Sequence, residues 1–211
     1  MAVKFRSSND EMTEANIVKA NIMVQIATNK ALDVSAPKFN MEKFKKAIEY
    51  VLTLTTKHED FYSGIYKAFF DAGVIFVILP NMSGSKINGA TKKIKDNVVL
   101  MVNDRRLYAD SFWFTLFHEI GHIINGDYGI SFEKELGEEA ADKYAEDSLI
   151  PPEKYQQFIK QKRFDVQSIK SFAKQINRDP GIVLGRLQND KKVQFNDWTM
   201  KSLKHKYKIT M

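Results

Sequence analysis

Hydrophobic positions in the first third of the chain recur at every third or fourth residue, which is the spacing of one helix face. This spacing predicts helices over residues 11–30, 41–54 and 60–72. The third helix is followed by Gly73, a residue typical of the position just after a helix end. The chain therefore opens with a block of amphipathic helices.

The period changes after Gly73. Residues 74–79 are continuously apolar and end at Pro80, which predicts a buried strand. Residues 86–94 and 97–102 predict two further strands that pair as antiparallel neighbours. Asn88-Gly89 has the composition of a turn.

A strongly apolar helix follows these strands. Asp110 or Ser111 would cap its start, and Gly126 would end it. After a loop over 127–132, the pattern predicts a helix over 133–149 that stops at Pro151. Shorter helices are predicted over 152–160, 165–177 and 181–188. The expected fold class is α+β, mostly helical, with a small antiparallel-containing sheet of about three strands beside the apolar helix.

The apolar helix contains His118, Glu119 and His122 in the HExxH pattern. Residues four apart lie one turn apart on the same helix face, so both imidazoles can reach one metal ion. Glu119 would then lie beside the water that such an ion carries and act as a general base. Two histidines in a polar groove could produce the same pattern without a metal. Gly121, which has no side chain, would let another element approach closely.

A catalytic zinc site needs a third protein ligand. The chain has no cysteine, and its other histidines are distant in sequence, so a carboxylate is the natural choice. Glu138 and Asp142 are one turn apart; one could bind the metal while the other holds a ligand imidazole. Glu139 points elsewhere. An acidic helix start, favoured by the helix dipole, is the alternative interpretation of these acids.

Composition narrows the class of protein. The absence of cysteine argues against a disulfide-stapled secreted protein, the first residues do not resemble a signal peptide, and no apolar run could span a membrane, so a cytoplasmic location is expected. The net charge of +6 owes much to a lysine-rich C-terminus, which predicts a solvated basic tail. Direct nucleic-acid binding is not expected, because no Arg-rich or aromatic-interleaved pattern accompanies the lysines.

Several segments together resemble the ImmA/IrrE family of metallopeptidases, and most closely the region downstream of the helix-turn-helix in HigA-type antitoxin-like regulators. The first motif is His118-Glu119-Ile120-Gly121-His122, and the second runs from Glu138 through Ala141, Asp142, Tyr144 and Ala145 to Leu149-Ile150-Pro151. The supporting segments are 76–80, 88–91, 112–115 and 179–188. No helix-turn-helix pattern precedes them in this chain.

The resemblance implies a zincin-like, gluzincin-type domain over 36–190, between a helical lead-in (1–35) and a basic tail (191–211). By position, His118, His122 and Glu138 would bind the metal, Zn²⁺ or another divalent ion such as Mn²⁺. Glu119 would be the general base, and Asp142 would orient a ligand. Ala140 and Asn125 replace an acidic residue and a histidine found in relatives, which affects details of the substrate groove rather than the ligands.

The resemblance further implies a metallo-endopeptidase that cleaves a helix-turn-helix repressor or antitoxin. A metal-binding sensor domain with little proteolysis, or a purely structural module, are the alternatives; retention of Glu119 favours the enzyme. Substrates of such enzymes often pair with an edge strand, and residues 97–102 are the candidate because they precede the helix. Tyr128 is the candidate donor to the oxyanion.

Overall fold

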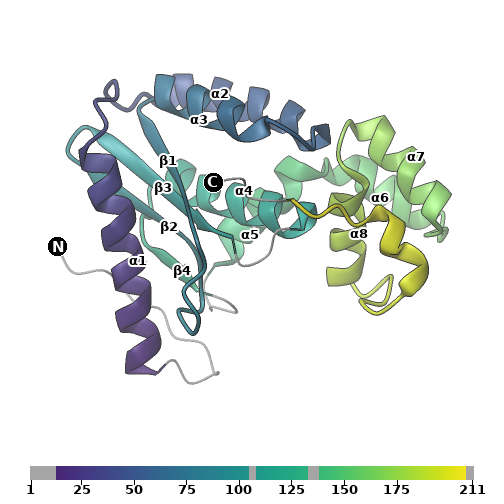
Figure 1. Ribbon diagram of the computed structural model, residues 1–211. Coiled ribbons are helices and arrows are strands. Elements are labelled where there is room, and N and C mark those ends of the chain that lie inside the picture. The colour runs from purple at the N-terminus through teal and green to yellow at the C-terminus, as the bar shows by residue number, and fades with distance from the viewer. Residues whose placement is uncertain (1–12, 105–107, 133–137, 208–211) are drawn as a thin grey trace.

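The computed structural model describes residues 13–104, 108–132 and 138–207 (Figure 1). Within these residues the fold is α+β and mostly helical, as predicted. In chain order the elements are α1 Glu14–Leu32, α2 Met41–Thr53, the 3₁₀ helix η1 Leu54–Thr56, α3 Phe61–Asp71, β1 Val74–Leu79, β2 Ile87–Ile94, β3 Asn97–Asn103, α4 Ala109–Asn125, β4 Ile130–Phe132, α5 Glu139–Leu149, α6 Pro152–Lys160, α7 Val166–Ile176, α8 Pro180–Asn189 and the 3₁₀ helix η2 Trp198–Leu203.

The strands form a mixed sheet in the order β1-β3-β2-β4. Strand β3 pairs in parallel with β1 and antiparallel with β2, so the predicted antiparallel pair is confirmed. Strand β4 pairs antiparallel with β2 and lies in the segment predicted as a loop, so that prediction was wrong. Three residues are too short for a period to be recognised, and pairing with β2 stabilises the strand.

The position of β3 corrects a second expectation. It is hydrogen-bonded on both sides, by β1 and by β2, and so has no free edge for a substrate. The edges of the sheet are β1 and β4. Its position just before α4 in the sequence did not show whether β3 is an edge strand, because the earlier strand β1 pairs with it in parallel.

Each face of the sheet has its own helical layer (Figure 1). Ile75 and Val77 of β1 pack with helix α1, whereas Val74 and Phe76 face the larger core formed with α2, α3 and α4. This alternation follows from the period of two along a strand. Helices α6, α7 and α8 form a lobe at the far end of α4 and α5 (Figure 1). The sheet is thereby buried on both faces, and α4 is enclosed between the sheet and the C-terminal helices.

Helix α4 begins earlier than predicted, at Ala109, and neither Asp110 nor Ser111 is its cap. The residue at the N-cap, Tyr108, makes no side-chain capping hydrogen bond. Instead the backbone N–H of Ala109 donates to the carbonyl oxygen of His205 at 2.9 Å. A returning segment near the C-terminus thus satisfies a donor that side-chain capping would otherwise take. The end of the helix at Gly126, with a φ of 75°, is as predicted.

None of the helices in the described part of the chain has both the length and the apolar character needed to cross a membrane.

Candidate metal centre

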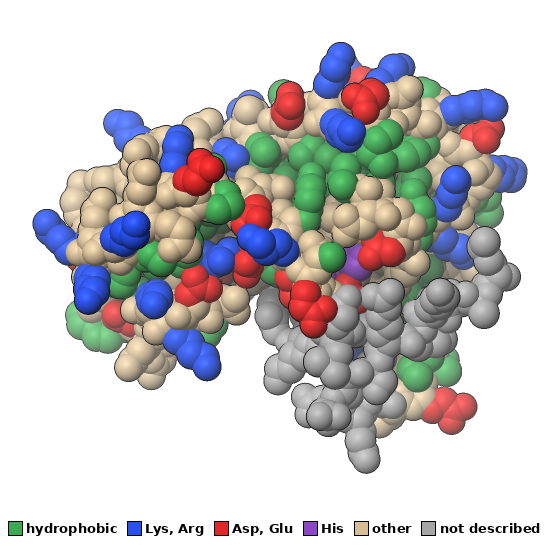
Figure 2. Space-filling model, turned by 180° about the vertical axis from the view of Figure 1, so that it is seen from behind, with side chains coloured by type: hydrophobic (Ala, Val, Ile, Leu, Met, Phe, Trp, Pro, Cys, Tyr) green, Lys and Arg blue, Asp and Glu red, His purple; other side chains and the backbone are tan. Residues whose placement is uncertain are grey.

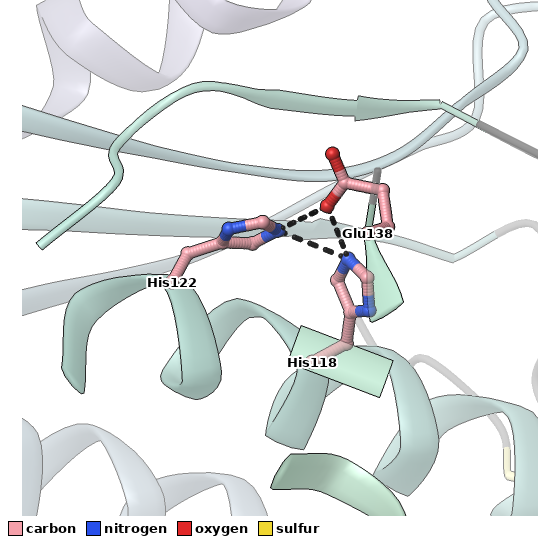
Figure 3. Close-up of side chains that lie close together, drawn as sticks. All are labelled: His118, His122 and Glu138. Atoms are coloured by element: carbon pink, nitrogen blue, oxygen red, sulfur yellow. Dashed lines mark hydrogen bonds and ion pairs between the residues drawn. The ribbon is translucent and has the colours of Figure 1, made fainter. Parts of the chain in front are cut away.

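Helix α4 places two imidazoles side by side in the interior. His118 and His122 are both buried, and their Nε2 atoms lie 3.0 Å apart (Figure 3). Their spacing of four residues sets them one turn apart on the same face of the helix. Each Nε2 is a hydrogen-bond donor or an acceptor depending on the tautomer of its ring, so the two atoms can share a proton or bind one cation between them.

Glu138 joins them from the other side (Figure 3). Its Oε2 lies 2.7 Å from His122 Nε2 and 3.3 Å from His118 Nε2. Glu138 is the N-cap residue of α5 rather than part of a longer helix, and the first part of the predicted helix, 133–137, lies outside the described residues. In the described parts of the chain these three residues are the group whose ligand atoms, all within 4.8 Å of one another, could hold a metal ion.

The outer nitrogens of both imidazoles also face carboxylates. His118 Nδ1 lies 2.8 Å from Asp142 Oδ1, and Asp142 is one turn beyond Glu138, whose carbonyl oxygen accepts its N–H. His122 Nδ1 lies 3.3 Å from Asp127 Oδ1. A carboxylate on Nδ1 holds the ring with Nε2 directed inward and makes it a better ligand.

The sequence interpretation missed Asp127. Its backbone N–H donates to the carbonyl oxygen of His122, because left-handed Gly126 turns the chain back over the last turn of α4. The sequence signal that could have revealed Asp127 is its place directly after Gly126, the glycine that ends the helix with the two histidines.

Glu119 lies fully buried beside this group. Neither carboxylate oxygen makes a hydrogen bond of normal geometry with any described residue. Burial raises the pKa of Glu119, the two imidazoles and Ser131 lower it again, and the result is about 7. A buried carboxylate without a firm partner is costly, which marks it as a candidate for chemistry.

Strand β2 makes room for Glu119. A Cβ added to Gly89 would lie 2.6 Å from both Cγ and Cδ of the glutamate, closer than real side chains approach. The interpretation of Asn88-Gly89 as a turn was therefore wrong: both residues lie inside β2, beside a register shift between Ile87 and Gly89. A glycine within a strand can mark a close approach of another group, and here that group is Glu119.

Gly121 has the role that its position predicts. A Cβ there would lie 3.1 Å from the Cα of Ala141 and 3.2 Å from the Cβ of Tyr144, both on α5. The missing side chain lets α5 pack directly on α4. That close packing sets Asp142 and Glu138 within reach of the imidazoles.

Charge at the centre is strongly coupled. Burial lowers the pKa of His118, but hydrogen bonds to Asp142 and Glu138 outweigh it and raise the pKa to about 10. Burial raises the pKa of Glu138, but the two imidazoles lower it to about 2. The carboxylates therefore stabilise positive charge between the rings, which protons or a metal cation can supply.

A cavity of about 560 Å³ opens onto the centre. His118, Glu138 and Asp142 line one part of it, together with Ser131 of β4. The other part extends to α8 and the segment beyond it, so the cavity lies between the metal-centre half of the molecule and the C-terminal lobe. In the view from behind, a histidine side chain is visible among acidic side chains (Figure 2).

Tyr128 is not among the residues that line this cavity. Its side chain is half-buried and packs against the main hydrophobic core. Burial raises the pKa of its hydroxyl. That Tyr128 donates to the oxyanion stays a prediction, and its place outside the cavity lining does not support it.

Residues 74–176 match the model of a peptidase family, peptidase M78, described as the IrrE N-terminal-like domain. Residues 74–176 therefore form an ImmA/IrrE-type domain, and the resemblance noted from the motifs is confirmed over this range. The matched range begins at β1 and ends at the end of α7, so it includes the sheet, both motif helices and every residue of the metal centre. A search of curated proteins found no match.

Proposed function

We propose that this protein is a metal-dependent endopeptidase, with His118, His122 and Glu138 as metal ligands and Glu119 as general base. The family match supports a peptidase, and the convergent donor atoms support a metal. The single observation that carries the proposal is the carboxylate of Glu119, which is fully buried beside the donors, makes no hydrogen bond of normal geometry with the described residues, and is accommodated by a glycine in β2.

The donor set fits zinc. Two imidazole nitrogens and one carboxylate oxygen are a set of three protein ligands that would hold a zinc ion and leave room for a bound water. The acids on the outer nitrogens of the rings add the support that such ligands need. A divalent ion held here would supply a water of lowered pKa and positive charge for a developing oxyanion. Mn²⁺ is the alternative ion.

The residues of the chain account for the remaining steps of peptide hydrolysis. A carboxylate oxygen of Glu119 accepts the proton of the attacking water and later returns it to the amine leaving group. A pKa near neutral suits both roles, and beside a bound cation the ionised form of Glu119 is favoured. Edge strand β4, whose Ser131 lines the cavity, is the element on which an extended substrate would pair.

A metal-binding sensor is the rival function. Such a module needs His118, His122 and Glu138 but has no use for a buried base. A glycine at position 89, where a side chain would collide with Glu119, favours the enzyme. From the family resemblance, the proposed substrate is a repressor or antitoxin-type protein with a helix-turn-helix.

The test combines metal content and cleavage. Purified protein should contain about one zinc or similar ion per chain, and His122→Ala should lose it. Incubation with candidate repressors encoded nearby should give site-specific cleavage that Glu119→Gln abolishes while retaining the metal. Cleavage that survives Glu119→Gln would exclude the proposed base, and metal retention without cleavage of any candidate would favour the sensor.

A further inference from the structure

Two aromatic side chains stand out on the surface. Phe195 is 70% exposed and Trp198 is 83% exposed, the highest fractions among the large hydrophobic residues described. The other tryptophan, Trp113, is completely buried. One exposed large apolar side chain is ordinary, but two that are three residues apart are more typical of a binding surface. We call Phe195 and Trp198 the aromatic lip.

The backbone that carries the lip is held firmly. The N–H of Lys192 donates to the carbonyl oxygen of Leu187 at 2.8 Å, and Gln188 Nε2 donates to the carbonyl oxygen of Gln194 at 3.1 Å. Beyond the lip, Met200 and Leu203 are buried in the main core. The segment therefore has apolar side chains that it buries, and it presents Phe195 and Trp198 outward from a fixed position.

One member of the lip, Phe195, adjoins the cavity of the candidate metal centre. Phe195 lines this cavity, as do Arg186 and Asn189 of α8 and, at the other end, His118 and Glu138. A chain lying in the cavity and leaving on the side of α8 would meet Phe195 first. Trp198 does not line the cavity; it comes three residues after Phe195, just beyond the turn in which the N–H of Asp197 donates to the carbonyl oxygen of Gln194.

Lysines are frequent in the sequence around the lip, whereas most of the charged side chains that line the cavity are acidic. Lys191, Lys192 and Lys201 are exposed close to the lip in sequence. Asp197 lies within this stretch, but its carboxylate accepts hydrogen bonds from the N–H and hydroxyl of Thr199. In Figure 2 the C-terminal lobe lies on the left, and lysine and arginine side chains are spread over it. A partner at the lip would gain from acidic residues.

We propose that the aromatic lip is a docking site for the protein substrate, outside the catalytic centre, and that it takes a large apolar side chain flanked by acidic residues. The inference rests on the proposed peptidase function, because the occupant is the protein whose chain enters the cavity. Exposed aromatic side chains contribute much of the binding energy of protein interfaces, and the lysines supply orientation and a faster encounter. Continuity of Phe195 with the cavity favours a peptide over a nucleic acid.

The test measures binding without cleavage. Zinc-loaded Glu119→Gln full-length protein is used to select short peptides from a random displayed library, and their dissociation constants are measured by fluorescence polarisation. The selected peptides should share a large apolar residue beside Asp or Glu. Adding Phe195→Ala and Trp198→Ala together should weaken their binding by about tenfold or more. Emission from Trp198 should shift to shorter wavelength when these peptides bind.

The matched control is Tyr50→Ala together with Leu32→Ala, which removes exposed hydrophobic side chains far from the cavity in the sequence and should leave binding unchanged. Recovery of no peptide, peptides without acidic residues, or equal binding to the lip variant overturns the proposal. Self-association that the lip variant abolishes would assign the lip to a second copy of the chain. Binding of a labelled single-stranded oligonucleotide that depends on the lip would assign it to nucleic acid.

Failure of the docking site and failure of the peptidase function are separable. If the lip is wrong, metal content and cleavage of short peptides that span only the cavity stay normal in the variant. If the protein is no peptidase, cleavage is absent but the peptides still bind in a manner that depends on the lip.

Discussion

At the scale of the residue, Glu119 is the most informative side chain. It is completely buried, makes no hydrogen bond of normal geometry within the described part of the chain, and occupies space that exists because residue 89 is a glycine. Burying a carboxylate in this way raises its pKa and reduces the stability of the metal-free protein when it is ionised. A cost of this kind is characteristic of a residue kept for function rather than for stability.

The first prediction concerns pH. The folded-state pKa of Glu119 lies above its usual value of 4.5, at about 7. The contribution of this group to the free energy of unfolding is therefore fully present below pH 4.5 and is lost as the pH rises through 7, because the folded protein disfavours the ionised form. Glu119→Gln should remove this loss. In metal-free protein we expect its free energy of unfolding to rise by roughly 1–3 kcal/mol at about pH 8. Urea unfolding with a chelator checks this, and an equal gain at about pH 4.5 would contradict it.

The second prediction tests the space around Glu119. Gly89→Ala places a methyl group against Cγ and Cδ of the glutamate and should cost about 1–3 kcal/mol of unfolding free energy. In a Glu119→Ala background most of this cost should disappear, since the two positions interact directly. A double-mutant cycle by urea unfolding measures the coupling. Costs that simply add would show that the strand, not the glutamate, requires glycine.

At the scale of the element, the centre is built by the contact of α4 with the start of α5. Gly121 allows the two helices to approach, and the turn after Gly126 returns Asp127 to His122. The His118 ring is thereby hydrogen-bonded through Nδ1 to Asp142, and the carboxylate of Asp127 lies 3.3 Å from Nδ1 of His122. Precision at the site therefore depends on the ends of two helices.

The third prediction follows from these outer carboxylates. Asp142→Asn and Asp127→Asn should each weaken zinc binding by about 10–100-fold, because the ring loses a charged partner on Nδ1. Asp142 should matter more, since its contact is 2.8 Å rather than 3.3 Å. Competition with a zinc chelator gives the affinities. Asp147→Asn on the same helix, which breaks only a surface pair with Lys143, is the control and should have no effect.

At the scale of the whole molecule, distant segments of the chain complete α4. The backbone of His205 accepts the N–H of Ala109, and the indole Nε1 of Trp113 donates to the hydroxyl of Tyr207 at 2.7 Å. The segment near the C-terminus thereby closes the fold over the start of the helix that carries the metal ligands. Its lysines do not prevent this packing, because Met200, Leu203 and Tyr207 are buried.

The fourth prediction tests this closure. Tyr207→Phe leaves the buried indole N–H of Trp113 without its partner and should lower the free energy of unfolding by about 1–3 kcal/mol. Zinc affinity should stay the same, because Tyr207 is remote from the ligands in the sequence and bonds only the first part of α4. Chemical denaturation and metal titration check both results. Tyr62→Phe, at a side chain that is 43% exposed, should change neither.

Much of the site was predictable from sequence because it is local. The spacing of His118 and His122 sets them on one helix face, and Glu138 and Asp142 are one turn apart by the same rule. The helices and the first three strands were predicted because their hydrophobic periods extend over many residues. The family resemblance then indicated Glu138 as the acid that would bind a metal, a choice that spacing alone left open.

The sequence by itself determined the helical blocks, the apolar strands and the metal motif, since each depends on hydrogen bonds and periods within a short stretch. Only the tertiary structure decided that β3 lies inside the sheet, that Gly89 accommodates Glu119, that Asp127 lies beside His122, and that Phe195 of the aromatic lip lines the cavity. These features depend on which strands pair and where the chain turns back. Such pairing is decided by packing of the whole chain, which no local pattern contains.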